Sequence, residues 1–584
     1  MVCKYLRYLM GMNKTLWPVV LLVLVLNCGC AGPEEYLIKA DNAAYSIIAQ
    51  KMVETGEGSA AEGEFEISGA GSVKEQLRQR LLRQQRLPSL ENPTFVASAV
   101  DYSQPLELSL LKALQVAAYN NRDYQLNKEK VFRQALALDL QREVFASSFN
   151  GLLSTMWSTK KSGSERIGGL HYGANGSWKH KFKSGVAFAA SIGFDLVQLL
   201  TANRVSARGI IADASISVPL MRGAGEQIAT EPLQQAELNV VYALWDFERY
   251  RRSFAVQIAS EYLLVLEWMN RVVTAHDNYQ RLVASRQRAE RLADAGRLPQ
   301  VQVGQALQDE LRARSSWVSA QQDSADRLDR FKIMLGLPTD SVVTLNLNQL
   351  EENSQITLPD DGEFEKQVPE SLVTTALLER RDLRVARGRV VDSRRAVLVA
   401  EDQLRADISL LGSGKAGSSR SLASVDSNNT GLDLDHGLYS ALLTVDLPIE
   451  RTAERNALRS CWLDWGERKR SLQELEDSIK YQIRSAWRGW REAYELIKIQ
   501  TQALKVARRR VASTDLFLRA GRIQMRDLLE AQDALVSARN ALVAAQVQYR
   551  IRVLELKRDI GTLDIDPAGG WLKDVIAYDD VAQK

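Results

Sequence analysis

The sequence predicts a mainly α-helical, elongated fold with a β-hairpin region, built as an internal tandem duplication. Three observations lead to this prediction. The two halves repeat in one ungapped register, which aligns Ala295 with Ala520. Helical patterns of nearly 70 residues occur in both halves, and segments that alternate apolar and polar residues occur only where the helices of each half stop.

The composition argues against several functional classes. Lys and Arg total 75 against 72 Asp and Glu, so the near-zero net charge gives no sign of a nucleic-acid binder. The four cysteines fit neither a disulfide framework nor a zinc cluster, and the four histidines are scattered. The chain contains no nucleophile elbow, phosphate-binding glycine loop or paired metal ligands, so we expect neither an enzyme nor a cofactor or metal.

Residues 1–30 have the pattern of an export signal. Basic residues precede the apolar run LWPVVLLVLVL, which is too short to cross a bilayer as a helix. The run ends in LNCGCAG, where Gly29 and Cys30 resemble a bacterial lipobox, whose cysteine is lipidated; Asn27 departs from that pattern. We favour lipidation of Cys30 over a plain signal peptide cleaved nearby. After residue 30 no apolar stretch reaches the roughly 18 residues of a transmembrane helix, so any membrane-spanning part is expected to be a barrel.

The repeat is clearest around two glycine turns. AGRLPQVQVGQALQDELRAR begins at Ala295, and AGRIQMRDLLEAQDALVSAR begins at Ala520. The same register pairs Gly336 with Gly561 and holds over about 80 residues. Each turn is therefore predicted to be one of two equivalent tips, where a long helix ends at a C-capping glycine and a shorter helix begins.

Both halves contain one long and two shorter helical patterns. The last pattern repeats an apolar residue every seven positions from Leu528 to Leu556 beside a stripe of alanines, which suits a helix packed against two neighbours. The combined length of two short helices placed end to end equals about that of one long helix, so each long helix runs past a break between two short ones. Loops or small strands are expected at that break, at mid-height, within 337–368 and 562–584. The long patterns cover 226–295 and 452–519, and the shorter ones 107–148, 299–336, 369–404 and 523–560.

Four segments alternate apolar and polar residues over about ten positions: GVAFAASIGFDL, IIADASISVPL, LRADISLL and YSALLTVDLP. This pattern is typical of strands in a membrane barrel, but taken strand by strand an ordinary sandwich is the more common source of it. Each half has too few strands to bury a core alone, so closure of a membrane sheet would need several chains. The polar loop 414–437 suits an extracellular loop, and five aromatic residues suit interfacial girdles: Trp157, Tyr172, Trp178, Phe182 and Tyr439.

At its strand-to-helix junctions, turns and helix ends, the chain resembles the TolC-like outer-membrane efflux proteins. The motifs are SVPLMRGAG (217–225) and TVDLPIERTAERN (444–456), the two AGR turns, and the LGLP and IGTLD ends; the likeness covers about residues 100–570. The junction residues are Pro219, Arg222, Pro448 and Arg451.

The resemblance implies a homotrimer in the outer membrane of a Gram-negative bacterium, spanning into the periplasm. Three chains would share one transmembrane β-barrel, and their coiled-coil helices would form a trimeric α-barrel tunnel. Such a channel is a passive exit duct of a tripartite efflux or type I secretion system. It docks to a periplasmic membrane-fusion adaptor and to an inner-membrane pump of RND, ABC or MFS type. The alternative is a periplasmic coiled-coil scaffold or adaptor lipoprotein without a pore, and no pattern identifies an exported substrate.

The expected organisation has six parts. The first hairpin region is longer than two strands require, and its extra pair at about 168–197 either enlarges the barrel or projects as a flap. The N-terminal tail is polar and is expected to be disordered apart from a helix near 34–52. The parts are a signal peptide (1–30), the polar tail (31–104), a first repeat (105–345) with strands at about 149–220, a linker (346–368), a second repeat (369–565) with strands at about 404–412 and 438–448, and a C-terminal tail (566–584).

The resemblance also assigns roles to residues at the tips. Asp527 and Glu530 follow the second tip glycine by six and nine residues and would narrow the pore entrance, where three copies place about six carboxylates that select cations. The alternative is that these acids only favour the dipole at a helix N-terminus. The equivalent first-copy residues, Gln302 and Gln305, are neutral. The adaptor is expected to dock on Gly296, Arg297, Leu298, Gly521, Arg522 and Ile523.

Overall fold

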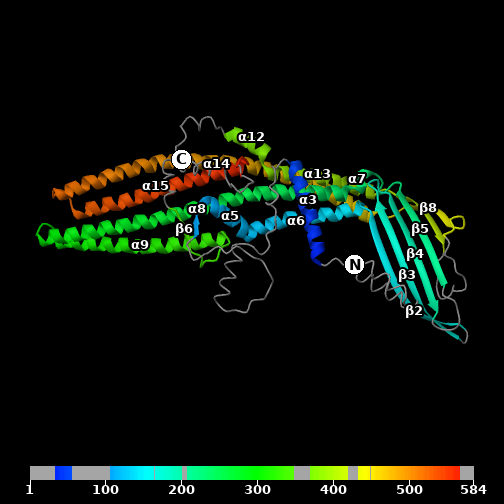
Figure 1. The fold of residues 1–584 in the computed structure, drawn as a ribbon. Helices are drawn as coiled ribbons and strands as arrows, with labels where there is room; N and C mark the ends of the chain where they lie inside the picture. The colour runs from blue at the N-terminus through cyan, green and yellow to red at the C-terminus, as the bar shows by residue number, and fades with distance from the viewer. Residues whose placement is uncertain are drawn as a thin grey trace.

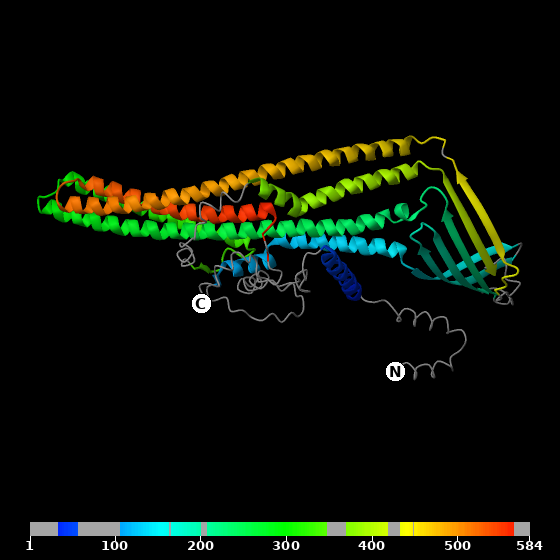
Figure 2. The ribbon, with the colours of Figure 1, turned by 90° about the horizontal axis from the view of Figure 1, so that it is seen from above.

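The computed structural model shows a long helical rod that carries a β-sheet at one end (Figures 1 and 2). The structure describes residues 33–55, 106–162, 165–199, 207–346, 369–417, 432–447, 449–563 and 565. Within those ranges, no helix combines the length and apolar character needed to cross a membrane.

The long helices lie side by side in one layer along the rod (Figure 2). Towards the sheet the order is α6, α8, α13, α14, and towards the far end it is α9, α8, α15, α14. The outer members of the layer are therefore α14 on one side and α6 with α9 on the other. The helices are α3 (Pro33–Thr55), α5 (Leu110–Asn120), α6 (Arg122–Phe145), α7 (Glu226–Ala229), α8 (Glu231–Asp294), α9 (Gln300–Met334), α12 (Pro369–Glu379), α13 (Arg381–Gln403), α14 (Thr452–Arg519) and α15 (Met525–Ile560).

The short helices stack end to end, as the sequence predicts, with α6 on α9 and α13 on α15. Where they meet, the Asn121 side-chain amide donates to the Met334 carbonyl at 2.8 Å. The Arg380 guanidinium donates to the Asp559 carbonyl at 3.4 Å. Met334 and Asp559 are aligned in the register of the repeat, so the duplicated halves make the same kind of joint. In each joint the helix farther from the sheet is followed by a glycine with positive φ: Gly336, at 74°, after α9, and Gly561, at 91°, after α15.

Three predicted helices are shorter than expected because each is interrupted. The predicted helices 107–148 and 369–404 break at Asn121 and Arg380, whose extended backbones (ψ of 127° and 124°) make each of them the N-cap of the next helix. The long helix predicted from Glu226 is also interrupted, at Thr230, which separates α7 from α8 just before Pro232. Proline is tolerated only in the first turn of a helix because it has no backbone N–H, so α8 begins there.

The main apolar core lies at mid-height, where α3, α5, α6 and α8 meet the small parallel pair β1 (Leu106–Leu108) and β6 (Val343–Leu345). Tyr262 on α8 is buried there, and its hydroxyl donates to the Leu108 carbonyl at 3.2 Å. Helix α3 crosses the rod and packs on α6 and α8 (Figure 1). Strand β6 therefore lies within 337–368, where loops or small strands were predicted.

Among the residues that the structure describes, one antiparallel sheet contains six strands in the order β2-β3-β4-β5-β7-β8. Strands β3 and β4, which hold the extra pair predicted near 168–197, hydrogen-bond to each other and to β2 and β5, so they widen this sheet and do not project as a flap. Strand β5 pairs with β7 and joins the two halves of the chain. The strands are β2 (Ser148–Ser162), β3 (Glu165–Lys181), β4 (Ala187–Leu199), β5 (Ala207–Pro219), β7 (Asp407–Gly417) and β8 (Leu438–Asp446).

The strand register collects the predicted apolar residues on one side of the sheet. Phe194 is level with Ile210 on β5, and Leu410 is level with Leu443 on β8. We call this side the apolar face; its members include Phe149, Leu153, Trp157, Trp178, Phe188, Ile192, Phe194, Leu196, Ile210, Ile216, Leu410, Tyr439, Leu443 and Val445. Trp157, Phe194 and Leu443 are 66%, 48% and 57% exposed, so no part of the chain that the structure describes covers this face. A sandwich would need a second sheet here.

Candidate functional site

The end of the rod far from the sheet is formed by two helix hairpins with the same turn. At the first turn the Gly296 N–H donates to the Ala293 carbonyl at 2.9 Å, and the Arg297 N–H donates to the Leu292 carbonyl at 2.8 Å. At the second, Gly521 and Arg522 donate to the carbonyls of Leu518 and Phe517, both at 3.0 Å. These are Schellman motifs, and their glycines have φ of 68° and 70°. Both tips are exposed, apart from half-buried Leu298 and Ile523.

We expect Gly521→Ala to destabilise the second tip by about 1 to 2 kcal/mol per chain, because the left-handed backbone penalises a Cβ atom. The cost comes from backbone conformation alone, since no atom lies within 4 Å of the added Cβ. The matched control is Gly304→Ala in α9, which is equally unobstructed but lies inside a helix and is expected to be neutral or slightly stabilising. Denaturant midpoints of the purified proteins measure both effects; equal midpoints for the two variants would contradict the assigned cap.

The two tips pack against each other through a small apolar cluster of α8, α9, α14 and α15. Met525, Leu528 and Leu529 are buried on the inner side of α15. The Gln302 side chain of the first tip accepts a hydrogen bond from the Met525 N–H at 3.3 Å, at the start of α15. Gln302 therefore caps the start of α15 in the other hairpin. Alignment of the two copies shows it only as a neutral counterpart of Asp527. Its only sequence signal was its place near a helix start.

Asp527 and Glu530 both lie on the outer side of α15, opposite the buried side chains. Asp527 accepts a hydrogen bond from the Gln524 N–H at 3.0 Å and completes a capping box, so the helix-start role considered from the sequence is present in the structure. Glu530 is exposed and pairs with Arg510 of α14 at 2.9 Å. The two carboxylates are therefore held on the surface near the tip, with Glu530 the more accessible to solvent.

An ion pair joins the two hairpins above the tips. Arg288 on α8 contacts Asp515 on α14 at 2.9 Å, and Arg519 contacts the same carboxylate at 2.6 Å. A second, longer pair links Arg539 on α15 to Asp277 on α8 at 3.6 Å. Both pairs connect helices of different halves of the chain, so no local pattern marks them. They oppose separation of the two hairpins.

The Asp515 pair is expected to stabilise the tips at neutral pH and to weaken in acid. Burial alone raises the pKa of Asp515, but hydrogen bonds from Arg288 and Arg519 outweigh it and bring the pKa below its ordinary value of 3.8. A depressed folded-state pKa means that the stabilisation is present above pH 3.8 and is lost as the pH falls through the folded-state pKa. Wild type should therefore exceed Asp515→Asn in unfolding free energy at neutral pH, with a gap that closes below pH 3.8. A gap that does not change with pH would show that the carboxylate charge is unimportant.

The strand-to-helix junctions differ between the two copies. Pro219 ends β5, and the chain then turns at Gly223, whose N–H donates to the buried Asp402 carboxylate at 2.8 Å. Arg222 lies half-buried in that turn. In the second copy Arg451 is the N-cap of α14, with no side-chain cap bond. Pro448 and Cys30 lie outside the described residues.

The comparisons with known proteins agree with this geometry. Residues 372–562 match the family described as outer membrane efflux protein. The outer-membrane channel OprN superposes with a TM-score of 0.55 at 16% identity, over 81% of this chain and 98% of that one. The fold is that of TolC-like efflux channels. The comparison with curated proteins finds no match.

Two further channels share this TolC-like fold. VceC of Vibrio cholerae aligns at 14% identity and a TM-score of 0.56, covering 77% of this chain and 96% of its own. CmeC of Campylobacter jejuni aligns at 13% identity and 0.55, covering 85% and 97%. The predicted resemblance is confirmed, as is the predicted mainly α-helical, TolC-like fold. At such low identity the comparisons support the shared fold but assign no role to any single side chain.

Proposed function

We propose that the protein is an outer-membrane channel, a passive duct through which a tripartite efflux or type I secretion system exports its substrate. The observation that carries the proposal is the apolar face: an exposed, apolar side of a six-stranded sheet at one end of a helical rod. Water disfavours such a surface, whereas lipid matches it. The other side of the sheet carries polar groups such as Ser191, Asp195 and Asp213. We assign no catalytic activity.

Closure of the sheet requires more copies of the chain. Strands β2 and β8 are the edges of the sheet, and open edges are costly in lipid because their backbone groups stay unpaired. Three copies, each contributing the six strands that the structure describes, would join β8 of one chain to β2 of the next in an eighteen-stranded barrel. A homotrimer is the proposed assembly.

The helical layer has apolar edges that suit the same assembly. Exposed apolar residues on α14 recur at intervals close to whole numbers of helical turns and so form one stripe: Leu463, Tyr481, Ile499, Val506 and Phe517. On the opposite edge, α9 exposes Leu307, Leu311 and Val318 at a similar helical spacing. Each stripe lies on an outer member of the layer, so α14 of one chain is proposed to pack against α6 and α9 of the next. The helices would then enclose a tunnel continuous with the barrel.

The tips are the proposed docking points for a periplasmic adaptor, which links the duct to an inner-membrane pump. They lie farthest from the sheet and present Gly296, Arg297, Gly521 and Arg522 to solvent. The alternative, a pore-free periplasmic scaffold, leaves the apolar face unexplained. Membrane fractionation distinguishes the two: the channel should remain in outer membranes after carbonate washing and run as a trimer in mild detergent. A monomer released into the soluble fraction after removal of any lipid anchor would favour the scaffold.

The proposed entrance makes a prediction for Asp527 and Glu530. Removing both charges with Asp527→Asn and Glu530→Gln should lower the permeability ratio of K⁺ over Cl⁻ several-fold, because a ring of carboxylates would be lost from the mouth. The matched control is Gln302→Asn with Gln305→Asn at the equivalent first-copy positions, which changes no charge. Reversal potentials in a salt gradient measure the ratio. Unchanged selectivity would remove these two residues from the pore and leave Asp527 with its capping role alone.

A further inference from the structure

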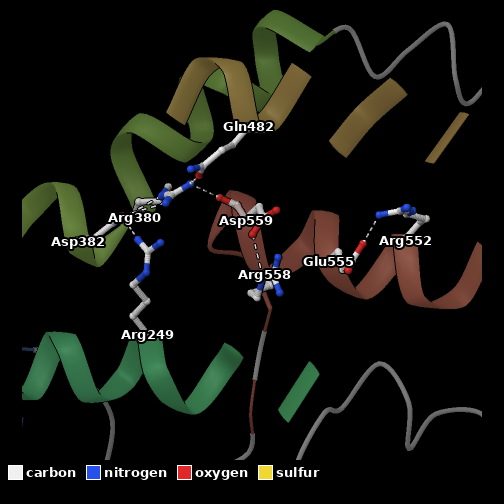
Figure 3. Close-up of polar contacts among 8 residues, drawn as sticks. All are labelled: Arg249, Arg380, Asp382, Gln482, Arg552, Glu555, Arg558 and Asp559. Carbon is white, nitrogen blue, oxygen red and sulfur yellow. Dashed lines mark hydrogen bonds and ion pairs between the residues drawn. The ribbon is translucent and has the colours of Figure 1, made fainter. Parts of the chain in front are cut away.

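A polar pocket of about 330 Å³ lies where α13 stacks on α15, between α8 and α14 (Figure 3). Its described lining contains more cationic than anionic side chains. Two aspartates, Asp382 and Asp559, line it. The arginines that line it are Arg249, Arg252, Arg380, Arg381 and Arg558.

The carboxylates of the pocket are already engaged by arginines. Asp382 accepts two hydrogen bonds from Arg380, at 3.1 Å and 2.8 Å, and also contacts Arg249. Asp559 pairs with Arg558 at 2.8 Å. Glu379, which lies outside the pocket lining, makes a longer contact with Arg381, at 3.9 Å. Figure 3 shows Arg249 and Arg380 converging on Asp382. One carboxylate is thus shared by two guanidinium groups, and positive charge remains in excess.

The environment disfavours this concentration of cations. Arg380 is 5% exposed, and its burial, followed by repulsion from Arg249, lowers its pKa to about 10. Burial also lowers the pKa of Arg249. A group whose pKa is lowered in this way is a cation that would gain from a nearby negative charge.

The equivalent joint of the first copy performs the same structural task without this charge. There the neutral amide of Asn121 donates to the Met334 carbonyl, as Arg380 does to the Asp559 carbonyl. That joint is also closed: a Cβ atom on Gly336 would lie 2.4 Å from the Asn120 carbonyl oxygen, whereas one on Gly561 would have 3.5 Å to its nearest neighbour. Stacking two helices therefore requires neither an arginine at the N-cap position nor the open space.

We infer that this pocket binds a soluble phosphate-type oxyanion, either free orthophosphate or a phosphate ester. Guanidinium groups form planar forks that bind phosphate oxygens in pairs, and a phosphate carries more than one negative charge near neutral pH. The volume admits such an anion together with water. The joint lies midway along the rod, away from the sheet, so a lipid headgroup is the less suitable source of the phosphate (Figure 1).

Equilibrium dialysis of the full-length, detergent-purified protein with radiolabelled orthophosphate, in chloride buffer of constant ionic strength, tests the site. Wild type should bind saturably, with about one phosphate per chain. Arg558→Gln should weaken binding by about tenfold or more, because a charge-assisted hydrogen bond is lost. The matched control is Arg552→Gln, on the same helix and paired with Glu555 at 2.8 Å, but outside the pocket lining. It should bind like wild type.

Two outcomes would overturn the site. One is the absence of saturable orthophosphate binding by wild type, including the case in which only vesicles containing phosphatidylglycerol bind at this pocket. The other is unchanged affinity in a folded Arg558→Gln protein. If that variant does not fold, as judged by circular dichroism, Arg252→Gln replaces it, since Arg252 also lines the pocket and bonds the Gly561 carbonyl at 3.0 Å.

Discussion

Ile192→Arg should abolish assembly of the protein in the outer membrane while leaving its synthesis and export intact. Ile192 lies in the middle of β4 on the apolar face, is 41% exposed, and is level with the small residues Gly176 and Ala212. An arginine on the lipid side of a barrel near the membrane centre costs about 2 to 4 kcal/mol, and a trimer would carry that cost three times. Outer-membrane trimers, counted by gel after fractionation, should fall to a small fraction of the wild-type amount.

The neighbouring residue provides the control for this prediction. Ser191→Arg introduces the same side chain one position away on β4, on the opposite side of the sheet and level with Asp213. That side is proposed to face the water-filled interior, so this variant should assemble like wild type. Equal loss of trimer in both variants would mean that neither face of the sheet contacts lipid.

Asp382→Ala should cause a large loss of stability, about 3 to 5 kcal/mol, because it leaves a buried arginine without its carboxylate. The Asp382 carboxylate accepts two hydrogen bonds from the Arg380 guanidinium and also contacts Arg249. Arg380 is 5% exposed. The joint between α13 and α15 should therefore loosen first. Thermal and denaturant unfolding of the purified protein measure the loss.

The duplication supplies a matched control for that prediction. Asp123 has the same place in α6 that Asp382 has in α13, two residues after the N-cap, but it is exposed. Asp123→Ala removes only a favourable charge at a helix N-terminus and should cost roughly 0.3 to 1 kcal/mol. Similar losses for the two variants would contradict the role given to the buried arginine.

Much of the fold could be predicted from local patterns because helices and strands have their own periods. The heptads around Leu528 indicate α15, and alternation around Ile192 indicates β4 and identifies its apolar side. The ungapped register of the repeat aligns Gly296 with Gly521, so the equivalence of the two turns follows from the sequence alone. Each of these signals resides in residues that are close in the chain or in a direct repeat of them.

The rest depends on contacts between distant residues. The breaks at Asn121 and Arg380 carry neither glycine nor proline, and helical periodicity continues through them, so the longer predicted helices were wrong there. At each break the side chain of the N-cap residue donates to a carbonyl of a helix far along the chain, that of Met334 for Asn121 and that of Asp559 for Arg380. Pairing of β5 with β7 and the salt bridge from Arg288 to Asp515 likewise join the two halves. Local patterns do not encode such pairings.

Conductance in planar lipid bilayers tests the central claim most directly. Purified wild-type trimers added to one side should produce long-lived current steps of uniform size, with cations carrying more of the current than anions. Ser191→Arg trimers serve as a second conducting sample, and the Ile192→Arg protein as the sample that should not insert. Intact wild-type trimers that insert no conducting unit, under conditions in which a known outer-membrane channel does, would contradict the proposal that this chain forms a duct.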